Sequence, residues 1–157
     1  MITQVTSPSN TTLKRLRSLK EKKYRRAEGL FLAEGLRICT EALDAGWVPK
    51  LLLFATAKGD HPLVRRLVQA TLGEGGQVLE TAPELLSGVT GKDNPQAVAG
   101  VFAEFDTSLR SIDRDRSSIW LVAQALRDPG NLGTMLRTGD AVGAGGLILI
   151  DDCADPF

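Results

Sequence analysis

The chain has 157 residues, of which 43% are hydrophobic and 24% are charged, and its formal net charge is zero. These proportions are those of a soluble globular protein with a real core, large enough for one domain or two small ones. No apolar run approaches the length of a membrane span, and the first residues do not begin a signal peptide. We therefore expect a cytoplasmic protein with no membrane partner.

The residues that most often bind metals are scarce. Cys39 and Cys153 lie far apart, which fits neither a disulfide framework nor a metal motif. We expect both to be buried thiols in a reducing compartment. His61 is the only histidine, so metal or triad chemistry based on histidine has no second partner. We predict a structural role for His61 and no metal site.

The charges are distributed unevenly along the chain. Residues 1–37 contain nine Lys and Arg against three Glu, whereas residues 38–157 contain ten basic and sixteen acidic residues. The first segment has a balance of +6 and the second a balance of −6. A basic N-terminal element on a neutral chain predicts an anionic partner at that end.

The basic segment has the pattern of one amphipathic helix. Residues 7–10 form a predicted turn and cap, Leu13, Leu16 and Leu19 recur at helical spacing, and the helix is expected to end near Gly29. The excess of positive charge leaves few ion-pair partners within the helix, which favours contact with a nucleic-acid backbone over an ordinary solvated face. The candidate substrate-binding cations are Lys14, Arg15, Arg17, Lys22, Lys23, Arg25 and Arg26.

Short strands and helices alternate between residues 30 and 105. This alternation predicts a small three-layer α/β domain over residues 1–105, followed by a linker over residues 106–117. The capping box Thr81-Ala82-Pro83-Glu84 predicts a helix start, and residues 92–95 predict a turn. The strands are expected at 30–33, 50–55, 77–80 and 98–105, and the helices at 36–43, from 62 onward and through 86.

Residues 118–157 have the order of a βαβ unit. Apolar runs at 119–123 and 146–150 flank the tight turn Asp128-Pro129-Gly130 and a helix that Asn131 is placed to cap. The binding position of such a unit is the turn after its first strand. The glycines at 143–146 follow a helix rather than a strand, which is the wrong order for a dinucleotide fingerprint.

Polar residues on this helix predict a site for ribose or phosphate. Gly133 lies one turn before Arg137 and leaves space beside the guanidinium, with Thr134 on the same side of the helix. A guanidinium binds phosphate oxygens through two hydrogen bonds, and a helix N-terminus adds free N–H groups. Two plainer interpretations stay open, namely that Asn131 is only a cap and that Arg137 is a solvated residue.

These residues resemble a known family. Asn131-x-Gly133-x-x-x-Arg137, with Asp128-Pro129-Gly130 before it and Gly143 after it, is similar to the first motif of the SpoU (TrmH-like) RNA methyltransferases of the SPOUT superfamily. The basic helix and the runs 7–10, 31–35 and 93–96 resemble that family's L30e-like substrate-binding domain. The resemblance covers almost the whole chain.

The resemblance implies methyl transfer from S-adenosylmethionine to a ribose 2′-hydroxyl of RNA, expected to be ribosomal, by a homodimer with a knotted catalytic domain. It implies catalytic roles for Arg137 and Asn131. It also implies a substrate-binding role for Glu34, in addition to Gly133 and Thr134. Residues 118–157 would then be the first βαβ portion of that domain, without the knot. The cofactor-binding residues are expected beyond Phe157, so this chain alone should bind RNA without turnover.

Two alternatives from other classes stay open at this point. One is a non-catalytic RNA-binding module of L30e-like fold, and the other is an α/β interaction domain whose basic helix contacts an acidic partner.

Overall fold

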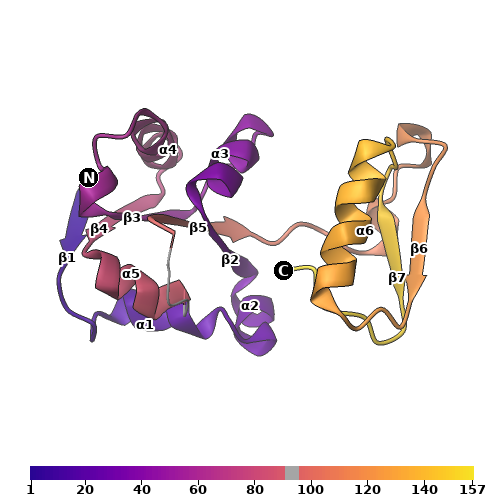
Figure 1. The fold of residues 1–157 in the computed structure, drawn as a ribbon, viewed down its shortest axis with the longest axis horizontal. Helices are drawn as coiled ribbons and strands as arrows, with labels where there is room; N and C mark the ends of the chain where they lie inside the picture. The colour runs from indigo at the N-terminus through magenta and orange to yellow at the C-terminus, as the bar shows by residue number, and fades with distance from the viewer. Residues whose placement is uncertain (91–95) are drawn as a thin grey trace. The chain divides into compact units, whose positions relative to one another are not determined.

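The structure, a computed structural model, describes residues 1–90 and 96–157 and divides into two units, Met1–Glu104 and Phe105–Phe157 (Figure 1). The predicted turn at 92–95 and most of the 93–96 run lie outside the described residues. Each unit has its own sheet.

The first unit is built on a five-stranded mixed sheet in the order β1-β4-β3-β5-β2. Strand β3 lies at its centre and all five of its residues are buried, as its continuous apolar run predicts. β1, β4 and β3 are parallel, whereas β5 is antiparallel to both β3 and β2. The strands are β1 Ile2–Val5, β2 Leu30–Glu34, β3 Leu51–Ala55, β4 Gln77–Thr81 and β5 Val98–Ala103.

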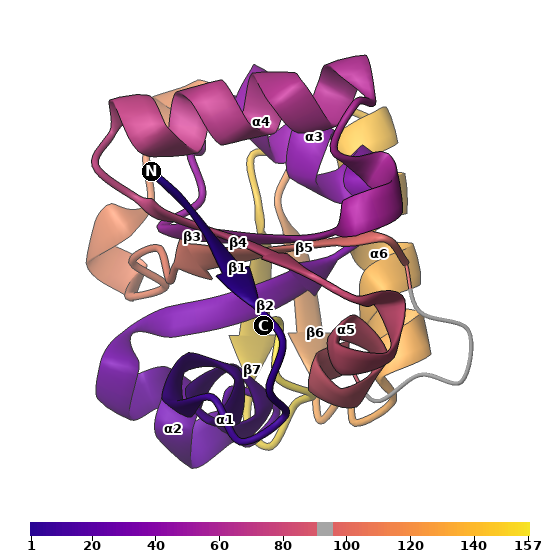
Figure 2. The ribbon, with the colours of Figure 1, turned by 90° about the vertical axis from the view of Figure 1, so that its left-hand side faces the viewer.

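Helices cover both faces of this sheet, so the predicted three-layer α/β arrangement is confirmed. α3 and α4 pack on one face, and α1, α2 and α5 lie on the other (Figure 2). A separate apolar cluster fills each interface, one around Leu16 and Leu53 and the other around Leu52 and Leu67. The helices are α1 Thr11–Ser18, α2 Lys22–Glu28, α3 Leu36–Asp44, α4 Pro62–Gly73 and α5 Pro83–Thr90, with a 3-10 turn at Thr56–Lys58.

The basic segment differs from its prediction. Asn10 caps α1 as expected, because its side-chain oxygen accepts hydrogen bonds from the N–H groups of Thr12 and Leu13 at 2.9 and 3.3 Å. The predicted single helix, however, is two helices that are separated at residues 19–21. α2 then ends at Glu28 and is followed by Gly29, whose φ of 62° is the left-handed conformation that glycine adopts without strain.

The start of α5 is not a capping box. Thr81 is the last residue of β4, and its buried hydroxyl donates to the carbonyl oxygen of Val5 at 2.9 Å. This bond ties β4 to β1, an edge strand that the sequence pattern did not indicate because only Val5 of its four residues is buried. His61 has the structural role predicted for it, since its Nδ1 accepts from the N–H of Leu63 and caps α4.

The second unit is a βαβ unit, as predicted. β6 (Leu121–Gln124) and β7 (Leu147–Ile150) are parallel neighbours joined by α6 (Pro129–Ala141). Gly139 is buried where α6 meets β6, and a Cβ there would lie 2.8 Å from a methyl carbon of Leu121. The segment between the two units' strands contains two 3-10 turns, Leu109–Ser111 and Arg114–Arg116.

Among the described residues, no helix is long and apolar enough to cross a membrane. Cys39 is fully buried, and burial raises its pKa to about 11, which makes it an unreactive thiol. Both cysteines are free thiols, although Cys153 is only partly buried.

Candidate functional site

The binding position predicted for the βαβ unit lies at the carboxyl ends of its two strands. Ala125 follows β6 with φ of 50°, and Asp151 follows β7 with φ of 61°. For residues with a Cβ, this conformation costs about 1–2 kcal/mol. Such conformations persist only where surrounding contacts fix them, and they cluster at functional sites.

Those surrounding contacts join the two loops. The N–H of Ala125 donates to the carbonyl oxygen of Ile150 at 3.0 Å, and the N–H of Ala154 donates to that of Leu126 at 2.7 Å. The Sγ of Cys153 accepts from the N–H of Leu126 at 3.3 Å. Cys153 therefore holds the two loops together at the edge of the sheet where α6 begins.

Asp128, rather than Asn131, is the cap of α6. The helix begins at Pro129, and Asp128 Oδ1 accepts from the N–H of Asn131 at 2.7 Å. The predicted capping role of Asn131 is therefore wrong. The Asn131 side chain is exposed, and among the described residues we find no hydrogen bond to it, so it is available to a ligand. The Asp128 carboxylate also reduces the attraction of this helix end for an anion.

Arg137 is exposed and held back along α6. Its Nη2 donates to Thr134 Oγ1 at 3.1 Å, and the Thr134 hydroxyl donates to the carbonyl oxygen of Gly130 at 2.9 Å. Its Nη1 lies 3.3 Å from the position a Cβ would take on Gly133. The Arg137 guanidinium itself thus fills the space next to Gly133 that was predicted to be open to a ligand. Thr134 contacts Arg137 directly.

On α6, Thr134 holds the Arg137 cation, and the Asn131 amide is exposed six residues nearer the start of the helix. Thr134 uses one of the five N–H donors of Arg137, which leaves the others for phosphate or ribose oxygens. A guanidinium stays protonated at physiological pH, so it stabilises a developing negative charge better than it accepts a proton. The surface can hold and polarise a ribose-phosphate group.

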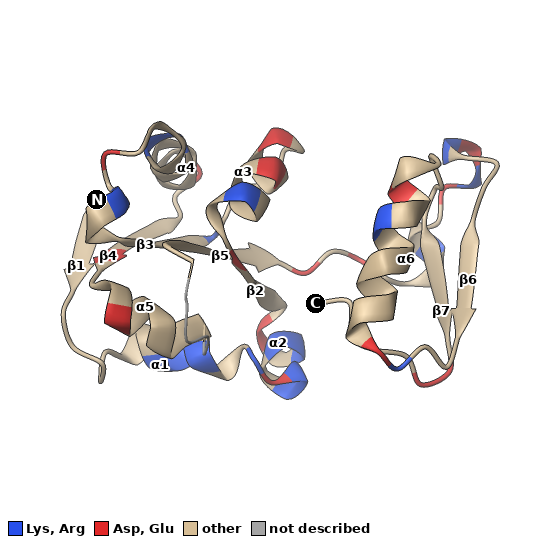
Figure 3. Cartoon of the chain, viewed as in Figure 1, with Lys and Arg blue, Asp and Glu red and all other residues tan. Residues whose placement is uncertain are grey.

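The first unit presents a second candidate surface on α1 and α2, where Lys and Arg gather (Figure 3). Several of the predicted cations have protein partners: Arg15 pairs with Glu28, Lys23 with Glu21 at 3.0 Å, and Arg17 donates to the carbonyl oxygen of Pro8 at 3.0 Å. Lys22 is exposed. The cations that are exposed and have no hydrogen bond or ion pair among the described residues are Lys14, Lys20 and Arg26.

Arg25 does not belong to that surface. Its side chain is only 8% exposed, and its Nη1 donates to the carbonyl oxygens of Leu19 and Lys20 at 3.1 and 2.9 Å. These carbonyls follow the end of α1, so the guanidinium caps that helix and fixes the turn into α2. The prediction that Arg25 contacts RNA is corrected by this burial, and Lys20, which the prediction omitted, is exposed instead.

Glu34 ends β2 and contacts the start of the segment before β5. Its Oε1 accepts from the N–H of Gln96 at 2.9 Å. Gly35 follows with φ of 126°, and its N–H donates to the carbonyl oxygen of Val98. The structure therefore gives Glu34 a contact that positions this loop, and its predicted contact with substrate stays a prediction.

Within residues 1–90 and 96–157, no group of three or more His, Cys, Asp or Glu side chains is placed to hold a metal ion.

Comparison with known proteins assigns the class. The profile of the MRM3-like substrate binding domain matches residues 10–100. The chain belongs to this family, within the SpoU (TrmH-like) group whose first motif its second unit resembles.

Individual relatives agree with that assignment. The chain is 31% identical over 154 residues to the 23S rRNA (guanosine(2553)-2′-O)-methyltransferase of Bacillus subtilis, and the match covers 98% of the chain and 57% of that protein. The crystal structure of an AdoMet-bound rRNA methyltransferase from Sinorhizobium meliloti is 40% identical, with a TM-score of 0.89 and coverage of 99% and 57%. The SpoU methyltransferase AviRb from Streptomyces viridochromogenes is 26% identical, with a TM-score of 0.79 and coverage of 93% and 55%. The chain thus spans about half the length of these relatives.

Proposed function

We propose that the protein of which this chain forms part transfers a methyl group from S-adenosylmethionine to a ribose 2′-hydroxyl of ribosomal RNA. The observation that carries the proposal is the Arg137–Thr134–Gly130 arrangement on α6, the helix that also presents the Asn131 amide, within a family whose relatives are rRNA methyltransferases. We also propose a cytoplasmic location, with which a bacterial-type ribosomal substrate is consistent.

In this proposal the two units have different roles, RNA binding and catalysis. Residues 1–105 bind the RNA through the exposed cations of α1 and α2, and residues 118–157 begin the methyltransferase domain, with 106–117 between them. We further propose that the protein acts as a homodimer. Exposed apolar side chains on the second unit, among them Val122, Val142 and Ile150, are available to be covered by the rest of the catalytic domain or by a second copy.

In the proposed reaction, this chain stabilises charge on the 2′-oxygen and orients the ribose. A 2′-hydroxyl is a poor nucleophile that must lose its proton as the new C–O bond forms, so charge develops on its oxygen. Arg137 stabilises that charge and holds the neighbouring phosphate, while Asn131 orients the ribose through its amide. S-adenosylmethionine supplies an electrophilic methyl group. No residue of this chain is assigned to bind that cofactor.

The test is methyl transfer by the full-length protein to ribosomal RNA lacking the modification. We expect radiolabel from S-adenosylmethionine to enter the RNA. One phosphodiester linkage of the RNA should then resist alkaline hydrolysis, because 2′-O-methylation removes the nucleophile for strand cleavage. RNA binding without label would favour the non-catalytic module. Label that leaves every linkage sensitive to alkali would place the methyl group on a base.

A further inference from the structure

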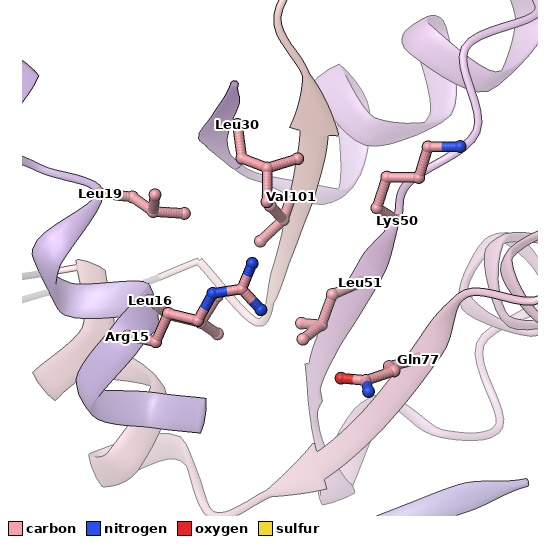
Figure 4. A pocket seen from close by; sticks show the side chains of 8 residues that line it. All are labelled: Arg15, Leu16, Leu19, Leu30, Lys50, Leu51, Gln77 and Val101. Atoms are coloured by element: carbon pink, nitrogen blue, oxygen red, sulfur yellow. The ribbon is translucent and has the colours of Figure 1, made fainter. Parts of the chain in front are cut away.

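The first unit contains a hollow of about 200 Å³ that no motif in the sequence indicated. It lies on the side of the sheet that α1 and α2 cover (Figure 4). Most of its walls come from α1 and from the four strands β2 to β5, and Leu19 and Lys50 line it from just outside these elements.

Strand register explains the apolar floor of the hollow. Leu51 of β3 pairs with Gln77 of β4 on one side and with Val101 of β5 on the other, which places these three residues in a row. Leu16 from α1 faces the row and Leu30 from β2 closes one end. Leu51 and Val101 are 5% and 2% exposed, so the floor is a fixed part of the core.

Three polar side chains surround this floor. Arg15 and Gln77 point toward the hollow from opposite sides, whereas the Lys50 ammonium points outward from its edge (Figure 4). Arg15 Nε is engaged by Glu28. For the remaining nitrogens of Arg15, for the Gln77 amide and for the Lys50 ammonium, no hydrogen bond or ion pair is found within the described part of the chain.

We propose that this hollow binds one unstacked nucleotide of the substrate RNA. The base packs on Leu51 and Val101, with the Arg15 guanidinium against it and the Gln77 amide on its hydrogen-bonding edge. A guanidinium plane against the base and a hydrogen-bonding group at its edge are two of the contacts by which single-stranded RNA bases are bound. The volume is below the range of about 300–1,000 Å³ for drug-sized ligands, which fits a single base.

Charge sets the orientation of the nucleotide. The Arg15 guanidinium is paired with the Glu28 carboxylate, and this pairing weakens its attraction for a phosphate. Lys50 attracts one at the outer edge, so the base points inward and the phosphate lies outside. The proposal rests on the RNA-binding part of the proposed function, and it adds a base-binding contact to the backbone contacts of α1 and α2.

The test is methyl and amide NMR of the 157-residue chain titrated with the four nucleoside 5′-monophosphates and with ribose 5-phosphate. We expect shifts of the Leu51 and Val101 methyl groups and of the Gln77 side-chain amide with nucleotides, and not with ribose 5-phosphate. We expect Lys50→Gln to weaken binding about two- to fivefold, as for an exposed ion pair. Gln77→Leu should weaken it about two- to tenfold and reduce the preference among bases.

Lys58→Gln is the matched control, because Lys58 is an exposed lysine remote from the hollow and should leave binding unchanged. Shifts confined to Lys14, Lys20 and Arg26, or equal binding of ribose 5-phosphate, would overturn the base-binding proposal. The result does not depend on methyl transfer: an inactive full-length protein with intact nucleotide shifts would remove the proposed reaction alone.

Discussion

At the scale of single residues, the Arg137 guanidinium owes its position to two neighbours on α6. Thr134 receives a hydrogen bond from it, and Gly133 leaves room for it 3.3 Å from where a Cβ would be. A side chain held by its own helix reaches the substrate already oriented, which lowers the entropy lost on binding. Thr134 and Gly133 therefore position Arg137. The four-residue spacing between Gly133 and Arg137 in the motif corresponds to about one helical turn.

Gly133→Ala separates this positioning from stability. Alanine should stabilise the helix interior by about 0.5–1 kcal/mol relative to glycine, seen in urea unfolding of the chain. The added methyl should move the guanidinium, so methyl transfer by the full-length protein should fall on the order of tenfold. Gly73→Ala, in the last turn of α4 with open space around it, is the control without an activity change. Full activity in Gly133→Ala would show that the guanidinium position is not critical.

Arg25 is a residue whose role the structure changes from binding to stability. Arg25→Met keeps the apolar stem but removes the bonds to the Leu19 and Lys20 carbonyls, so we expect the free energy of unfolding to fall by about 1–3 kcal/mol. Arg26→Met, on the exposed neighbour, should change it by less than about 0.5 kcal/mol. Equal effects in urea unfolding would contradict the capping role of Arg25.

At the scale of elements, α1 and α2 present cations on a surface of their own. The two cations that are both predicted and without a protein partner, Lys14 and Arg26, are the best candidates for phosphate contact. Arg15, Arg17 and Lys23 are engaged within the protein and contribute less.

We predict that Lys14→Gln with Arg26→Gln weakens RNA binding by the chain and lowers the slope of log affinity against log salt by about 1–2. Each lost phosphate contact removes about 0.7–0.9 of slope because fewer counterions are released. Arg65→Gln with Arg66→Gln removes the same charge from α4, whose cations pair with Asp60 and Asp44, and should leave the slope unchanged. An equal loss of slope in both variants would indicate a general charge effect.

An element could be predicted from the sequence where local residue patterns determine it. β3 and the βαβ order of β6, α6 and β7 depend on local apolar runs and turn residues, so they were predicted correctly. The break between α1 and α2 has no glycine or proline and depends on side-chain contacts that Arg25 makes to carbonyl oxygens five and six residues before it. It could not be found from periodicity.

The candidate functional residues likewise divide into those with a local sequence signal and those without one. The start of α6 had a local signal that was missed, since Pro129 favours the first helical position and makes Asp128 the cap. The hollow beside Leu51 depends on register across three strands, and no spacing in the sequence reports that. The predicted roles of Asn131, Glu34 and Arg137 toward substrate stay predictions.

At the scale of the whole molecule, each candidate role belongs to one unit. The family match at residues 10–100 lies in the first unit, and Arg137 lies in the second. Loss of the α1 and α2 cations should therefore raise KM for RNA with little change in kcat, whereas loss of Arg137 should lower kcat.

The central claim is tested by single-turnover methyl transfer to ribosomal RNA by the full-length protein carrying Arg137→Ala. We predict a fall of about 10²–10³-fold in the rate, the size seen when one stabilising donor is removed from a transition state. Arg110→Ala, an exposed arginine of the same unit, should leave the rate unchanged. An Arg137→Ala protein as fast as the unmodified one would contradict the account.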